Sequence, residues 1–182
     1  TFEALARMEH KEQLVLGFFY GIVAILVVYN LFLYFSLRDT AYLFYCAYVS
    51  VYLVFQMSEN GLLGEWILPG FPWAANQALA FLVYLVVIAA SIFTWRYLGN
   101  PRSLAFRIAM GFFLICGTAG ALVSMFIPYF MAVIPAVALV MLYGPVVVPI
   151  SFLEWRKGNR AAGHFMLGWS AILVGGVVYG LK

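Results

Sequence analysis

Asn30 is the polar side chain best placed for specific chemistry inside an apolar stretch. It stands alone in VVYNLFLYF, residues 27–35, among apolar and aromatic neighbours. A carboxamide is both donor and acceptor, and leaving it without partners in hydrocarbon is costly. We therefore expect Asn30 to face protein. It is either an interhelical hydrogen-bonding residue or a polar switch point whose partner changes with the state of the protein.

Three prolines fall in another apolar stretch, residues 130–153: Pro135, Pro145 and Pro149. Each removes a backbone donor and crowds the preceding turn, so we expect this helix to be kinked or locally unwound. The prolines are candidate hinge residues. The alternative is that they serve no gating role, as is common for proline in membrane helices.

Two glycine pairs have the small-xxx-small spacing that lets helix backbones approach closely. They are Gly17 with Gly21 and Gly176 with Gly180. We expect the first and last apolar stretches to pack through these glycines, against each other, against a missing helix or across a homodimer.

Groups suited to catalysis are missing from the apolar stretches. No Asp, Glu, Lys, Arg or His lies in the interior of any stretch, whereas proton relays and many ion pathways need such residues. No Ser/His/Asp set, HExxH or glycine-rich phosphate loop is present. His10 and His164 are expected near opposite membrane faces. We predict no catalytic residue, cofactor or metal site, so the chain by itself is not an enzyme.

The composition places these residues in a bilayer. Of 182 residues, 66% are hydrophobic and 9% charged, against roughly 45–50% and 25% in soluble domains. The formal charge of +3 is small and is not arranged along one face. This pattern excludes nucleic acid as a partner.

The apolar stretches are long enough to cross the hydrocarbon core as helices, the default structure where lipid offers backbone groups no partner. The predicted fold is an all-α polytopic membrane bundle, with residues 1–13 as a juxtamembrane tail and 14–182 as the transmembrane domain. Six helices are expected near residues 14–37, 41–57, 74–97, 104–126, 130–153 and 162–181.

Cationic residues set the expected orientation. Those between the stretches all lie in or beside connections that follow odd-numbered stretches, so the positive-inside rule puts these connections in the cytoplasm and the N-terminus outside. The expected inner-face anchors are Arg38, Arg96, Arg102, Arg107, Arg156, Lys157 and Arg160. The sixth stretch then ends outside without a hydrophilic tail, so a seventh helix is expected.

Two connections have recognisable chemistry. Arg38-Asp39-Thr40 between long apolar runs predicts a tight helical hairpin, with Asp39 or Thr40 capping the second helix. The connection at residues 58–73, SENGLLGEWILPGFPW, is aromatic and acidic with several Gly and Pro residues. We expect it to lie along the outer membrane surface as an irregular segment.

Several motifs together resemble the membrane region of bacterial seven-transmembrane receptors with diverse intracellular signalling modules. They are LGFFYGI, YNLFLYFSLRDTAYLFYCAY, NGLLGEWILPG and EWRKGNRAAGHFMLGWS followed by VVYGLK. The Asn, the turn and the following aromatics are the most specific part. At Asn159 the chain departs from the family's usual aromatic residue. The resemblance implies seven helices, a periplasmic sensor domain before them and a histidine kinase, diguanylate cyclase or similar output domain after them.

The leading functional hypothesis is therefore a signal-transducing module of the bacterial inner membrane. Its partners would be the lipid bilayer, the sensor and output domains of the same chain, and a second copy in a homodimer. The alternative is a transporter or channel subunit for a neutral small solute or lipid. In that case Asn30, Gln56, Ser91 and Thr94 would line the path. A scaffold that binds lipid or protein through its aromatic surfaces is the third possibility.

Overall fold

The computed structural model describes residues 2–67, 69–99, 101 and 103–169, and side-chain surroundings for these residues other than 2–12 and 72–75. The described chain contains five long α-helices and one short π-helix. Their bounds are α1 Phe2–Leu37, α2 Thr40–Glu59, η1 Leu63–Ile67, α3 Pro72–Tyr97, α4 Leu104–Ser124 and α5 Tyr129–Arg156.

The prediction of an all-α polytopic bundle is confirmed. Within the described residues, five helices are long and apolar enough to cross a membrane, and they correspond to the first five predicted stretches. Residues 160–169 begin a further helix at the place of the sixth. The rest of that stretch, with Gly176 and Gly180, lies outside the described residues. Helix α1 starts at Phe2, so the predicted tail continues the first spanning helix.

The turn between α1 and α2 explains how two long apolar helices reverse direction within so few residues. Arg38 takes the left-handed conformation, with φ of 57°, and its N–H donates to the carbonyl of Tyr34 at 2.8 Å. Asp39 then caps α2, because its Oδ1 accepts the N–H of Ala41 at 2.9 Å. Of the two predicted caps, the structure therefore shows Asp39.

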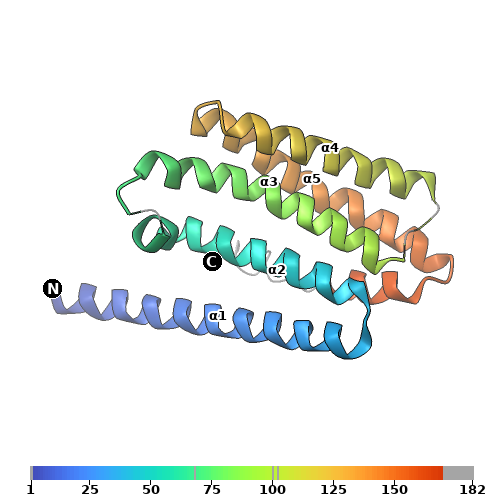
Figure 1. The fold of residues 1–182 in the computed structure, drawn as a ribbon, viewed down its shortest axis with the longest axis horizontal. Coiled ribbons are helices and arrows are strands. Elements are labelled where there is room, and N and C mark those ends of the chain that lie inside the picture. The colour runs from blue at the N-terminus through green and yellow to red at the C-terminus, as the bar shows by residue number, and fades with distance from the viewer. Residues whose placement is uncertain (1, 68, 100, 102, 170–182) are drawn as a thin grey trace.

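Helix α3 is the centre of the bundle. It packs against α2 on one side and against α4 on the other, and it also contacts α5 and the π-helix η1 (Figure 1). Helix α1 lies at the edge with α2 as its principal neighbour. The α1–α2 turn, the end of α3 and the end of α5 lie at one end of the bundle (Figure 1), which we call the cationic end.

Small residues on α4 allow α3 to come close. An added Cβ at Gly120 would stand 2.2 Å from Cε1 of Tyr84, and one at Gly117 would stand 2.9 Å from Cγ1 of Ile88. The Tyr84 ring thus lies directly on the α4 backbone, and its hydroxyl donates to the carbonyl of Ala132 at 3.1 Å. One tyrosine therefore connects three helices.

The three prolines do not interrupt α5, which is helical from Tyr129 to Arg156. Of the two expected outcomes, local unwinding is therefore not seen. Pro135, Pro145 and Pro149 all lie on the exposed side of the helix, and Ala132, Ala136 and Val147 on the other side are fully buried. Tight packing of the buried side keeps the helix continuous although three backbone donors are missing. Hinge motion at these prolines stays a prediction.

The α3–α4 contact can be tested with Gly120→Ala. The new methyl group must displace the Tyr84 ring, which weakens both the packing and the bond to Ala132. We expect the free energy of unfolding in detergent micelles to fall by about 1–3 kcal/mol. Gly111→Ala on the same helix is the matched control, because no atom lies within 4 Å of an added Cβ there. Equal stability of the two variants would contradict the close contact.

Candidate functional site

The larger of two candidate sites formed by described residues is a cavity of about 1070 Å³ near the cationic end, between α1, α2, α3 and the helix at residues 160–169. We call it the inner cavity. Its walls are mainly aromatic, and the non-aromatic polar groups come from Asn30, Asp39, Thr94, Arg96 and His164. The aromatic residues that line it are Tyr29, Tyr42, Tyr45, Tyr48, Phe93, Tyr97, Phe165 and Trp169.

Asn30 lies in the α1 wall of the inner cavity and is only 9% exposed, so it faces protein as expected. Its Nδ2 donates to the carbonyl of Leu26 at 2.8 Å, one turn back in the same helix. The hydrogen bond is thus within α1 and does not reach another helix. The amide is satisfied without fixing α1 to its neighbours. A role as a switch point stays a prediction.

Phe93 is the centre of an aromatic cluster on the cavity wall. Its ring stacks on Tyr48 with centroids 5.9 Å apart and planes at 5°, and it also contacts Tyr45 at 5.4 Å and Tyr97 at 5.3 Å. Offset or tilted aromatic pairs of this kind contribute about 0.5–1.5 kcal/mol beyond simple burial. Phe93 therefore couples α2 to α3.

The same chain of rings continues across the bundle. Tyr97 contacts Phe165 at 6.2 Å, Phe165 contacts Trp169 at 6.2 Å, and Trp169 contacts Tyr143 at 5.7 Å. Tyr143 in turn packs on Phe113 of α4 at 4.8 Å. This series, which we call the aromatic network, passes without a gap from α2 through α3, the helix at 160–169 and α5 to α4.

A buried hydrogen bond fixes the middle of the aromatic network. The hydroxyls of Thr94 on α3 and Tyr143 on α5 are 3.0 Å apart, and these residues are 1% and 3% exposed. Ser91, one turn before Thr94, instead donates to the Val87 carbonyl of its own helix. The Thr94 hydroxyl thus links α3 to Tyr143 of α5.

Asn159 links two helices at the cationic end. Its Nδ2 donates to the carbonyl of Leu98 at 2.8 Å, and its Oδ1 accepts the N–H of Ala161 at 3.1 Å. One side chain thus ties the end of α3 to the start of the helix at 160–169 and caps that helix. An amide can make both bonds, whereas an aromatic ring could make neither.

The structure describes six of the predicted inner-face anchors, places them at one end of the bundle and leaves all six exposed. These are Arg38, Arg96, Arg107, Arg156, Lys157 and Arg160, and Arg102 lies outside the described residues. The guanidinium of Arg96 stands over the Phe44 ring at 5.2 Å. Lys157 pairs with Glu154 at 2.7 Å. Which membrane face this end occupies stays a prediction.

The glycine pair on α1 is open. No atom lies within 4 Å of a Cβ added at Gly17 or Gly21, and both residues are exposed. The described part of the chain therefore leaves this face of α1 uncovered. Its expected partner helix, with Gly176 and Gly180, falls outside the described residues.

The polar residues proposed for a transport path are not all brought together. Asn30 and Thr94 line the inner cavity, whereas Gln56 and Ser91 do not. The Gln56 carbonyl accepts the Tyr20 hydroxyl at 3.1 Å, which links α1 to α2 instead. Across the described residues there is also no group of three His, Cys, Asp or Glu side chains that could hold a metal ion.

This fold and site define a class of protein: a multi-pass membrane helix bundle with an aromatic cavity near its cationic end. The chain belongs to the family described as 7TM diverse intracellular signalling, which it matches over residues 12–182. It is thus a transmembrane sensory or signalling module. No curated protein and no solved structure matches the chain.

Sequence reasoning missed the aromatic network and the double role of Asn159. The aromatic content of 19% signalled many rings, but nothing in the sequence distinguished a lipid-facing ring from a network ring. For Asn159, the available signal was its place before the helical run beginning at Arg160, because asparagine is a favoured N-cap residue.

Asn159→Ala tests the link between the end of α3 and the helix at 160–169. The variant loses the helix cap and leaves the Leu98 carbonyl without its amide donor. We expect the free energy of unfolding to fall by about 1–2 kcal/mol. Asn159→Asp keeps the acceptor for Ala161 and should lose less. Chemical or thermal unfolding in micelles measures both, and an Ala variant as stable as the wild type would contradict the assigned role.

Proposed function

We propose that this chain is the transmitting module of a bacterial inner-membrane receptor. A periplasmic signal enters through α1, and rearrangement of the bundle carries it to a cytoplasmic output domain of histidine kinase or diguanylate cyclase type. The N-terminus would then be outside and the cationic end inside. The observation that carries the proposal is the contrast between a loosely held α1 and an aromatic network that joins the remaining helices.

Helix α1 has the weakest hold on the bundle. In its most apolar stretch 6% of residues are buried, against 39% in α3. Its polar links to α2 are few: Tyr20 to Gln56 and Asn60 near one end, and Cys46 Sγ to the Val27 carbonyl at 3.4 Å. A helix with so little buried surface can shift at low energetic cost, as a receiving element must.

The aromatic network supplies the path by which such a shift would reach the output side. The cavity separates α1 from the helix at 160–169, and Asn30 lies on its α1 wall. A movement of α1 changes which α1 side chains face Tyr45, Tyr48 and Phe93 across the cavity. Tyr45 and Tyr48 of α2 pack on Phe93 of α3. Phe93 contacts Tyr97 on the same helix, and Tyr97 contacts Phe165 in the helix at 160–169. The coupling proposed here is physical contact between packed rings.

A homodimer fits the open glycine face of α1, and dimerisation is part of the proposal. Gly17 and Gly21 present a small-residue surface with no neighbour in the described structure. In membranes such surfaces support close helix pairing. The chain described here is proposed to have no catalytic role. Any kinase or cyclase chemistry would belong to the output domain.

Asn30→Leu tests the switch role in the parent protein. Leucine removes the amide while keeping an apolar residue on the cavity wall. If Asn30 exchanges its partner for one on another helix during signalling, we expect basal output to change by about threefold, equivalent to the roughly 0.6 kcal/mol typical of an interhelical hydrogen bond in a membrane bundle. Output activity of membranes with matched receptor levels is the measurement.

The control for this experiment is Phe32→Leu. Phe32 lies two residues after Asn30 on α1, and its side chain is 69% exposed. It should leave output unchanged. Unaltered output in the Asn30 variant, with normal insertion, would remove Asn30 from the mechanism. Equal effects of both variants would assign the change to general disturbance of α1.

The inner cavity is the one observation that favours the alternative of neutral solute or lipid passage. Because Gln56 and Ser91 do not line it, we expect solute flux in liposomes containing the purified chain to equal that of empty liposomes. A glycerol or urea swelling assay measures this. Flux clearly above the empty-liposome rate, and abolished by Thr94→Trp, would overturn the receptor proposal in favour of transport.

A further inference from the structure

A second hollow lies on the outside of the bundle, between the end of α5 and the helix at 160–169. It measures about 390 Å³ and is lined by Trp155, Arg160, Gly163, His164, Met166 and Leu167. We call it the outer groove. Its volume falls within the roughly 300–1,000 Å³ of ordinary ligand pockets. Nothing in the proposed signalling path uses it.

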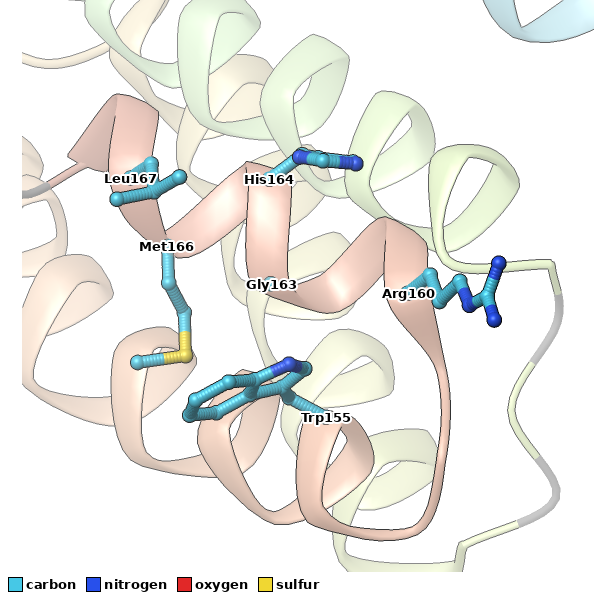
Figure 2. Close-up of a pocket in the computed structure, with 6 residues that line it drawn as sticks. All are labelled: Trp155, Arg160, Gly163, His164, Met166 and Leu167. Atoms are coloured by element: carbon cyan, nitrogen blue, oxygen red, sulfur yellow. The ribbon is translucent and has the colours of Figure 1, made fainter.

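The floor of the outer groove is built by one glycine. An added Cβ at Gly163 would stand 2.9 Å from both Cδ1 and Nε1 of Trp155, so the indole lies directly against the helix backbone. Figure 2 shows Trp155 below Gly163, with Met166 extending toward the same ring. The result is a wide apolar surface that a larger residue at position 163 would remove.

The outer groove has a charged end and an apolar end. Arg160, Gly163, His164 and Leu167 follow one stripe of the helix, and Arg160 stands in its first turn at the cationic end (Figure 2). Leu167 is about 10 Å further into the bundle at the helical rise of 1.5 Å per residue, and it is 70% exposed. The polarity thus changes along the groove as it does along a phospholipid.

The charge at this end is positive and uncompensated. Lys157 is neutralised by Glu154, but Arg160 has no carboxylate within salt-bridge distance among the described residues. Arg156, in the last turn of α5, is also exposed and cationic. The first turn of the helix adds backbone N–H groups that favour an anion. Charge complementarity therefore favours an acidic headgroup over a zwitterionic one.

We propose that the outer groove binds one anionic phospholipid. The phosphate lies at Arg160. One acyl chain runs along Gly163 and Leu167. Basic pockets between membrane helices are suited to such headgroups, and long cationic side chains reach the interface where phosphates lie.

Native mass spectrometry of the full chain in detergent tests the headgroup. Phosphatidylglycerol is titrated against phosphatidylethanolamine of the same acyl composition. We expect the protein to retain one phosphatidylglycerol molecule in preference to phosphatidylethanolamine. Arg160→Gln should weaken its binding about fivefold. Arg107→Gln, an exposed cation at the same end on α4, is the matched control and should have little effect. Equal losses in both variants, or equal retention of the two lipids, would overturn the site.

A second pair of variants tests the apolar end. Leu167→Trp fills the groove and should also lower phosphatidylglycerol retention. Ile115→Trp on α4 is the control, because Ile115 is 71% exposed and lies at a comparable distance from the cationic end. Unfolding temperatures of all variants show whether they are folded. Wild-type retention by a folded Leu167→Trp variant would overturn the proposal, whatever the result for Asn30 in signalling.

Discussion

The close approach of α3 and α4 is the constraint on which the rest of the structure depends. In lipid there is little hydrophobic gain from bringing helices together, so packing and hydrogen bonds must hold them. Gly120 allows Tyr84 to lie on the α4 backbone and to reach Ala132 of α5. Because a helix is rigid, this contact sets the rotation of α3 along its length. Phe93, Thr94 and Leu98 then take the positions from which they contact α2, α5 and Asn159.

Helix α1 lies outside this constraint. The helices around α3 are tied by buried rings, by a buried hydroxyl pair and by Gln77, whose Nε2 donates to the carbonyls of Ser124 and Ile127. Among the described residues, the polar links of α1 are those to α2 and an amide that bonds within its own turn. A rigid group of helices beside a loosely held one permits relative motion without loss of the fold, because the contacts that define the fold are not those that change.

The sequence predicted the spanning helices well because length and hydropathy decide them. Asp39 as a cap followed from turn chemistry. Helix faces could not be predicted in the same way, because the lipid-facing and protein-facing sides are both apolar and leave little periodic signal. Tyr29 is 57% exposed whereas Tyr143 is 3% exposed, although both interrupt similar apolar runs. The burial of Asn30 was predictable from the cost of an exposed amide, but its partner depended on how far away the next helix lay.

The helix at residues 160–169 connects two features that otherwise have separate roles. His164 lines both the inner cavity and the outer groove, so this helix forms the wall between them. On one side Phe165 and Trp169 belong to the aromatic network, and on the other Gly163 carries the Trp155 ring. A helix cannot tilt toward one side without changing the space on the other. Occupancy of the outer groove by the proposed lipid would therefore be linked to the packing of the aromatic network through a single rigid element.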